Sequence, residues 1–240
     1  MINSIYRLFY EKQPESIDAF TPVDNLSVTF LNPYSLYKAV PSELYENFTY
    51  IGSDAVLPLY LNKLFNAKPF SRFSFDMSSV APYIMGYAVE KMKSIYLLGA
   101  DDSSINKFVE NIRFDYPQLN IIGFHNGYIS SCKSEVFTEI IQKQPDLVII
   151  GMGTPLQDST SVELRQFGYK GAIYTCGGFF HQGASNLYYF PKWVNRLNIR
   201  ALYRIVQEPY VLKRIVCYWP KFIFTYSRFL MRYRKQLKDK

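Results

Sequence analysis

SIYLLGADDSSINKFVENIRF, residues 94–114, places an apolar strand, a glycine turn and an amphipathic helix in direct succession. Asp101 and Asp102 stand at the start of that helix, where the helix dipole stabilises negative charge and a carboxylate can cap the first turn. The stretch has about the length that a crossover between parallel strands requires. It therefore predicts a strand-turn-helix unit.

The same alternation continues on both sides of residues 94–114. Another helix follows Gly52-Ser53-Asp54 and can hold Pro58 in its first turn, whereas Pro41 interrupts the segment 35–48. This alternation predicts an α/β, Rossmann-like fold: a doubly wound, mostly parallel sheet with helices on both faces. Further strands are expected at 27–31, in 48–52, at 120–124, in 145–153 and in 171–178, and further helices at 78–92, 134–144 and 159–168.

The charge of the chain divides at residue 191. Residues 1–191 carry 14 Lys and Arg against 18 Asp and Glu, a net charge of −4, whereas residues 192–240 carry 13 against 2, a net charge of +11. In the second segment Arg196, Arg200 and Arg204 stand four apart among aromatic and aliphatic residues, a spacing that predicts one face of a helix. We therefore expect a Rossmann-like domain over 1–191 and a basic, aromatic helical tail over 192–240.

Composition argues against several classes of protein. The 240 residues are 48% hydrophobic and 20% charged, which supports a folded core rather than disorder. Three cysteines without a CxxC pair and two histidines disfavour a disulfide framework and a structural zinc site, and they suit a reducing cytoplasm. We expect the cysteines to be buried as small apolar groups. No run of 18 apolar residues and no leader-like start occur, so we expect neither a membrane span nor export.

Polar and glycine residues gather where the predicted strands end, and in an open parallel sheet ligands bind at these ends. The richest such loop is GMGTPLQD, residues 151–158, which fits a ligand site and a tight turn capped by Asp158 or Ser159 about equally. No GxGxxG or GxxxxGK[ST] motif occurs. Their absence disfavours a dinucleotide-dependent oxidoreductase and a Walker-type NTPase.

Asp54 is the carboxylate that we single out, because it lies between a strand end and an apolar helix. Poor solvation there would raise its pKa and suit it to act as a general base, although helix capping is the more ordinary role for such a residue. His181, in CGGFFHQ, has no nucleophile motif nearby. It fits a structural or ligand-contacting role better than a catalytic one.

Taken in order, these loops resemble the WecG/TagA/CpsF glycosyltransferase family over roughly residues 27–214. The resemblance implies transfer of a sugar from a UDP-sugar to a polyprenyl-diphosphate-linked saccharide in bacterial surface polysaccharide biosynthesis, with inversion and without a metal or other cofactor. It rests on Asn32-Pro33, Asp54, Arg72 with Asp76, IYLLGA (95–100), YPQLNIIGFHNGY (116–128), PDLVIIGMGTPLQD (145–158), Gly177-Gly178, and PKW, LYR and EP in the tail.

The resemblance also implies roles for individual residues. Asp54 matches the proposed catalytic base, which would take the proton from the acceptor hydroxyl. Arg204 and Arg214 match tail positions that would meet the lipid diphosphate, for which an arginine fork is well suited. The donor site would contain Asn32, Asp76, Gly99, Gly151, Gly153, Gln157 and Gly177.

The chain departs from the family pattern in several of these loops and in the tail. Ala55 stands where the family has Gly, Leu156 and Asp158 stand where it has Lys and Glu, and Phe180 or His181 stands near the Asp expected after the Gly-Gly loop. These changes concern the donor sugar more than the reaction class, and they keep open the alternative of a catalytically inactive relative.

The tail has several possible roles. Cationic and aromatic side chains suit a helix in the headgroup region of an anionic membrane, which predicts a cytoplasmic protein peripheral to the inner face of the plasma membrane. The tail could instead pack on the domain, or hold RNA through phosphate contacts and base stacking. We expect no nucleic acid, because an RNA-binding module leaves the order of the loops unexplained.

Overall fold

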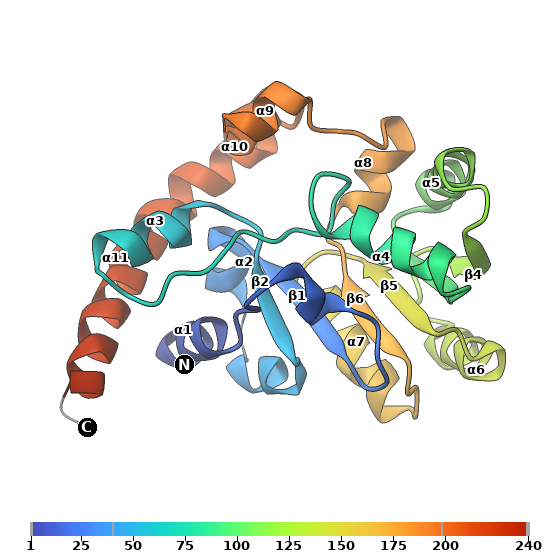
Figure 1. Cartoon of the computed structure of the whole chain (residues 1–240), viewed down its shortest axis with the longest axis horizontal. Coiled ribbons are helices and arrows are strands. Elements are labelled where there is room, and N and C mark those ends of the chain that lie inside the picture. The colour runs from blue at the N-terminus through green and yellow to red at the C-terminus, as the bar shows by residue number, and fades with distance from the viewer. Residues whose placement is uncertain (1, 40, 198, 239–240) are drawn as a thin grey trace.

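A six-stranded sheet forms the centre of the computed structural model, which describes residues 2–39, 41–197 and 199–238 (Figure 1). The strands lie in the order β2-β1-β6-β5-β3-β4, and each neighbouring pair is parallel. The predicted Rossmann-like class is confirmed, and the described strands are all parallel rather than mostly so. The strands are β1 (Ser27–Leu31), β2 (Tyr50–Ser53), β3 (Ser94–Gly99), β4 (Asn120–His125), β5 (Leu147–Gly151) and β6 (Ala172–Thr175).

Helices fill the connections between the strands and follow the last of them. The unit at 94–114 folds as expected, and Asp101 caps its helix by accepting a hydrogen bond from the Ser104 N–H at 2.9 Å. The helices are α1 (Ile2–Glu11), η1 (Ile17–Phe20), α2 (Pro33–Lys38), η2 (Ser42–Asn47), α3 (Leu57–Leu64), α4 (Val80–Glu90), α5 (Asp102–Asp115), α6 (Lys133–Lys143), α7 (Leu156–Gln166), α8 (Phe179–Ser185), α9 (Lys192–Arg196), α10 (Arg200–Gln207) and α11 (Tyr210–Lys238).

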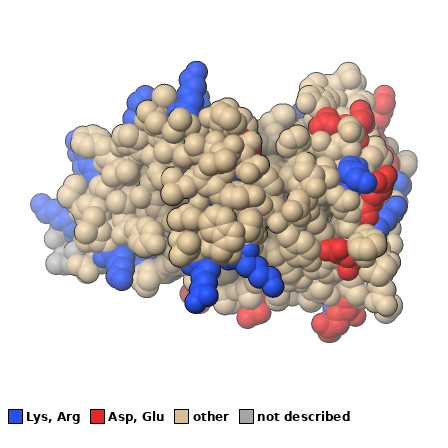
Figure 2. Space-filling model, turned by 90° about the horizontal axis from the view of Figure 1, so that it is seen from above, with Lys and Arg blue, Asp and Glu red and all other residues tan. Residues whose placement is uncertain are grey.

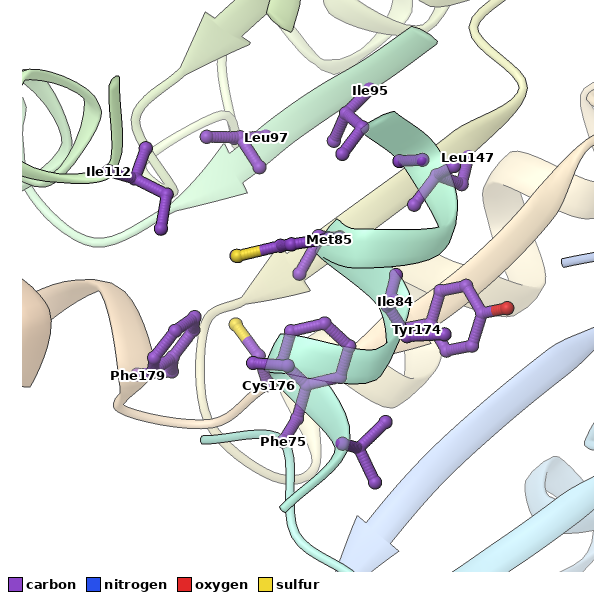
Figure 3. Close-up of a cluster of buried hydrophobic side chains, with 14 of the residues drawn as sticks. Phe75, Ile84, Met85, Ile95, Leu97, Ile112, Leu147, Tyr174, Cys176 and Phe179 are labelled. Atoms are coloured by element: carbon purple, nitrogen blue, oxygen red, sulfur yellow. The ribbon is translucent and has the colours of Figure 1, made fainter. Parts of the chain in front are cut away.

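One face of the sheet packs against α4, α5 and α8. Figure 3 shows Ile84 and Met85 of α4 lying against Ile95, Leu97 and Leu147 of the strands, and all five are buried. Because successive side chains of a strand point to opposite faces, the intervening Tyr96, Leu98 and Val148 pack with α6 and α7 on the other side. Helices therefore cover both faces of the sheet, as predicted.

A third apolar cluster joins the two ends of the chain beside β1 and β2. Phe222 and Tyr226 of α11 pack on Tyr6 and Phe9 of α1, and the ring centroids of Tyr6 and Tyr226 lie 5.2 Å apart. The Tyr226 hydroxyl donates to Oδ1 of Asn62 in α3 at 2.9 Å. The far part of the basic tail is therefore built into the core.

The tail begins as short helices rather than as one continuous face. α9 ends at Arg196 and α10 begins at Arg200, so the three arginines predicted on one helix face lie on two helices. Figure 2 shows Lys and Arg over the half of the molecule that holds the tail, with Asp and Glu gathered mainly on the other half. Residues 198 and 239–240 of the predicted tail lie outside the described residues, and in the rest of the structure no helix combines the length and apolar character needed to cross a membrane.

Candidate functional site

The loops that follow the strands meet at the carboxyl edge of the sheet. Asp54 directly follows β2, which is the edge strand, and β3 lies four strands away in the sheet order. Most of the residues expected at the donor site lie at the strand ends, in the loops or in the first helical turn between these two positions: Asn32, Gly99, Gly151, Gly153, Gln157 and Gly177. The structure therefore places a row of candidate ligand-binding loops on one side of Asp54.

The Asp54 side chain has no hydrogen-bond partner among the described residues. Its backbone N–H donates to the Leu31 carbonyl at 2.9 Å, which fixes it beside the end of β1. The N-cap of α3 is Val56, without a side-chain cap, so Asp54 does not cap this helix. Burial raises the pKa of the Asp54 carboxyl, and the positive charge of Arg72 opposes that rise. A partly buried carboxylate thus lies directly after β2, and its proton-accepting oxygens have no hydrogen-bond partner among the described residues.

Three arginines from two distant parts of the chain lie near enough to Asp54 for their positive charges to lower its pKa. Arg72 reaches it because the chain there runs alongside the end of β2, where the Phe73 N–H donates to the Ser53 carbonyl at 2.9 Å. Arg200 and Arg204 come from α10 and place their charges near the same carboxylate. The resemblance assigned a site role to Arg204 alone. For Arg72 and Arg200 the sequence offered only spacing as a signal of a site role. Arg72 stands four residues before Asp76, and Arg200 belongs to the regularly spaced arginines of the tail.

Asp76 fastens α10 to the loop before α4. Its Oδ2 accepts hydrogen bonds from Nη1 of Arg200 at 2.7 Å and from Oγ of Ser74 at 2.5 Å, and its Oδ1 accepts one from the Ser78 N–H at 2.8 Å. The Arg200 and Asp76 side chains are only 15% and 14% exposed. Both carboxylate oxygens are thus used within the protein, and the donor-binding role expected for Asp76 stays a prediction.

Glu208 holds Arg204 by an ion pair and hydrogen bonds. Burial alone would raise its pKa, but hydrogen bonds from Arg204, Tyr210 and Tyr189 outweigh burial and lower the pKa to about 2. Nη2 of Arg204 donates to its Oε2 at 2.7 Å. Arg214 stacks between aromatic rings, 4.6 Å from the centroid of Tyr34 and 4.7 Å from that of Tyr210. The two arginines expected to meet a diphosphate are therefore linked through the Tyr210 side chain.

Gln157 ties together the loops that follow β5 and β6. Its Oε1 accepts a hydrogen bond from the Gly153 N–H at 3.2 Å and another from the Gly177 N–H at 3.0 Å. A Cβ at either glycine would meet nothing within 4 Å, so both positions face open space. This part of the predicted donor site is a pair of loops held at a fixed separation.

Gly99 and Gly151 are explained by packing rather than by ligand approach. A Cβ at Gly99 would lie 2.2 Å from the Gly151 carbonyl oxygen, and one at Gly151 would lie 2.7 Å from the Phe180 ring. Asn32 caps α2, because its Oδ1 accepts hydrogen bonds from the Tyr34 and Ser35 N–H groups, both at 3.0 Å. The donor-binding roles of these three residues stay predictions.

Asp158 lies directly beneath Gln157 and is fully buried. It does not cap α7, which begins at Leu156 with Pro155 as N-cap. Its Oδ1 accepts a hydrogen bond from Thr29 at 2.6 Å and its Oδ2 one from Tyr45 at 3.1 Å. Burial raises the pKa of Asp158 to about 6, and these hydrogen bonds limit the rise. A buried carboxylate thus connects β1 and η2 to the first turn of α7, which also carries Gln157.

Cysteines and possible metal ligands are dispersed. Cys176 is buried, which raises its pKa, whereas Cys132 is half-buried and Cys217 is exposed, so the expectation that all three are buried is wrong. Within the described ranges, no three His, Cys, Asp or Glu side chains lie close enough to hold a metal ion together. Metal independence stays a prediction.

Comparison with known proteins confirms the resemblance drawn from the sequence. The model of the glycosyl transferase WecG/TagA/CpsF family matches residues 4–237. A UDP-Gal:alpha-D-GlcNAc-diphosphoundecaprenol beta-1,4-galactosyltransferase of Shigella boydii is 38% identical over 83% of this chain and 84% of its own length. An N-acetylglucosaminyldiphosphoundecaprenol N-acetyl-beta-D-mannosaminyltransferase of Bacillus subtilis (strain 168) is 28% identical over 82% of this chain and 77% of its own length.

Proposed function

The chain belongs to the WecG/TagA/CpsF glycosyltransferase family, and we propose that it transfers a sugar from a UDP-sugar to a saccharide carried on a polyprenyl diphosphate, with Asp54 as the general base. The observation that carries this proposal is the uncommitted Asp54 carboxylate among Arg72, Arg200 and Arg204, at the end of a row of ligand-type loops. A base and several fixed positive charges are what displacement of a diphosphate by a hydroxyl requires.

The proposed reaction is a single displacement. Asp54 takes the proton of the acceptor hydroxyl while that oxygen forms a bond to the anomeric carbon of the donor sugar. The bond from this carbon to the diphosphate oxygen breaks, and its electron pair leaves with UDP. Arg72 is placed to stabilise the negative charge that develops on the leaving diphosphate, whereas Arg204 and Arg214 would hold the diphosphate of the acceptor.

The burial of Asp54 fits this role in physical terms. A carboxylate with a raised pKa is a stronger base than one in water, and the positive charges of the nearby arginines favour its ionised form. The same charges would attract both diphosphate substrates to the edge of the sheet. Inversion at the anomeric carbon follows from one displacement, and no metal ion is needed in this scheme.

The names of the relatives suggest which substrates to test first. Both act on GlcNAc or N-acetylglucosaminyl diphosphoundecaprenol, and one of them uses UDP-Gal. We would incubate the full chain with synthetic GlcNAc-diphosphoundecaprenol and, separately, UDP-Gal, UDP-Glc and UDP-GlcNAc, and measure product mass and anomeric configuration. A mass gain of one sugar with a β linkage is expected from one donor. No gain with any UDP-sugar, or a retained α linkage, would contradict the proposal.

The tail supports a second part of the proposal, that the protein is cytoplasmic and lies on the inner face of the plasma membrane. Arg200 and Arg204 face the site, while Leu202 and Val206 of the same helix are 60% and 76% exposed. The apolar edge continues through exposed Trp193 and neighbouring residues of α9, α10 and α11. An amphipathic helix with cations at its margin suits the boundary between lipid headgroups and acyl chains.

Membrane contact can be tested without removing the tail, which is part of the core. The double variant Leu202→Glu/Val206→Glu should lose most of its flotation with vesicles of anionic phospholipid. Phe114→Glu is the matched control, because Phe114 is also exposed but lies on α5. Equal flotation of wild type and the double variant would remove this part of the proposal.

A further inference from the structure

His181 belongs to a hydrogen-bonded relay that the proposed reaction does not use. Oγ of Ser104 donates to Oδ2 of Asp101 at 2.7 Å, and Nδ1 of His181 lies 3.2 Å from the same Oγ. A serine hydroxyl has one proton, which Asp101 receives here, so the Ser104 oxygen can only accept from the imidazole. Nδ1 therefore carries the ring proton, and Nε2 of the neutral ring is left as an acceptor.

The relay fixes the imidazole in position as well as in tautomer. Asp101 is the N-cap of α5 and also accepts a hydrogen bond from the Ser104 N–H at 2.9 Å, so the relay is anchored to the backbone. These hydrogen bonds lower the pKa of Asp101 and keep it ionised as the terminal acceptor. His181 is exposed, and its Nε2 has no partner within the described part of the chain. An oriented acceptor thus points away from the protein's own hydrogen-bond network.

His181 lies along the ligand edge, on the helix that follows β6, and contacts the helix that follows β3 through Ser104. It follows the Gly177-Gly178 loop that Gln157 holds, and β3 is four strands from β2, the strand before Asp54. At the spacing of about 4.8 Å between neighbouring strands, the ends of β2 and β3 lie on the order of 19 Å apart along the sheet. If the reacting carbon of a UDP-sugar lies at Asp54, the nucleobase must lie toward the other end of the row.

We propose that Nε2 of His181 accepts a hydrogen bond from the N3–H of the donor's uracil ring and so selects uridine over cytidine nucleotides; this rests on the proposed UDP-sugar donor. Uracil carries a proton on N3, whereas cytosine presents a lone pair there. The acceptor fixed by Ser104 and Asp101 therefore suits uracil and repels cytosine. His181 is a specificity-determining residue in this scheme and takes no part in proton transfer at the sugar.

The test compares binding of UDP, N3-methyl-UDP and CDP to the full chain by titration calorimetry. Wild type should bind UDP about fivefold to tenfold more tightly than the other two, the worth of one buried hydrogen bond. In His181→Ala the ratio of the affinity for UDP to that for CDP or N3-methyl-UDP should fall toward one, and in Ser104→Ala this ratio should be reduced. Ser103→Ala is the control, because Ser103 is exposed on the same turn and lies outside the relay.

Kinetics give a second readout, because His181→Ala should raise KM for the UDP-sugar and leave kcat within about twofold. A UDP preference that persists unchanged in His181→Ala would overturn the assignment of His181 while leaving the donor class intact. A wild type that binds UDP and CDP equally would overturn it as well. Failure of wild type to bind UDP at all would refute the proposed donor, and the assignment of His181 with it.

Discussion

Replacing the buried carboxylate Asp158 by Asn should change how the stability of this protein depends on pH. Burial holds the pKa of Asp158 at about 6 in the folded chain, against an ordinary value of 3.8. Between these two pH values the folded state keeps the proton that the unfolded state has lost. Stability therefore falls as pH rises from about 4 to about 6, and it is constant with respect to this group above that range.

The size of the effect follows from the two pKa values. A difference between 3.8 and about 6 corresponds to about 3 kcal/mol of unfolding free energy. The Asp158 side chain has no exposed surface, so little solvent screening reduces this value. Glu208, whose pKa is lowered to about 2, loses its stabilising contribution only as pH falls below about 4.5, and so it does not obscure the range of interest.

The assay is urea unfolding followed by circular dichroism at several pH values from 4.5 to 7, at constant ionic strength. Wild type should lose most of this 3 kcal/mol across the range, and Asp158→Asn should lose correspondingly less. Glu135→Gln removes an exposed carboxylate on α6 and should retain the wild-type slope. Equal slopes for wild type and Asp158→Asn would show that Asp158 does not titrate in this range and would refute the reasoning.

Two further changes test the loops and the tail. Gln157→Ala removes the acceptor for two loop N–H groups and should raise KM for the UDP-sugar by roughly tenfold or more, with Gln157→Glu largely retaining the wild-type value in steady-state kinetics. A KM unchanged in Gln157→Ala would mean that the two loops bind the UDP-sugar without the hydrogen bonds to Gln157. Arg200→Gln breaks the mostly buried ion pair to Asp76 and should speed proteolytic cleavage between α9 and α10, measured by mass spectrometry, whereas Lys107→Gln breaks an exposed pair and should not. Equal cleavage of both variants would show that this ion pair does not hold α10.

Much of the fold could be predicted because its signals are local. In residues 94–114 the apolar run, the turn at Gly99 and the cap at Asp101 are adjacent in sequence, and each acts within one strand or one helix. α1 was not predicted, because the partner that buries Tyr6 and Phe9 is α11, more than 200 residues away. The prediction of one continuous arginine face was wrong because α9 ends at Arg196 and α10 begins at Arg200.

In the candidate site, too, local features could be predicted from the sequence, whereas contacts between distant residues could not. The position of Asp54 at a strand end was evident from the sequence, but only the structure shows that Asp54 does not cap the helix, since Val56 occupies the N-cap position. Arg72 and Arg200 meet near Asp54 from opposite parts of the chain, and no local pattern reports that meeting. Asp158, one of two residues that the sequence offered as a helix cap, is instead fully buried, and Thr29 and Tyr45 from elsewhere in the chain supply its hydrogen bonds.

The most direct test of the central claim is the turnover number of Asp54→Asn, measured beside its affinity for UDP. Asn keeps the shape of the side chain but cannot take a proton from the acceptor hydroxyl. The account predicts UDP affinity within about threefold of wild type and a kcat lower by roughly 100- to 10,000-fold. A variant that binds UDP normally and turns over near the wild-type rate would show that another group removes the proton, and Asp54 would have to be abandoned as the base.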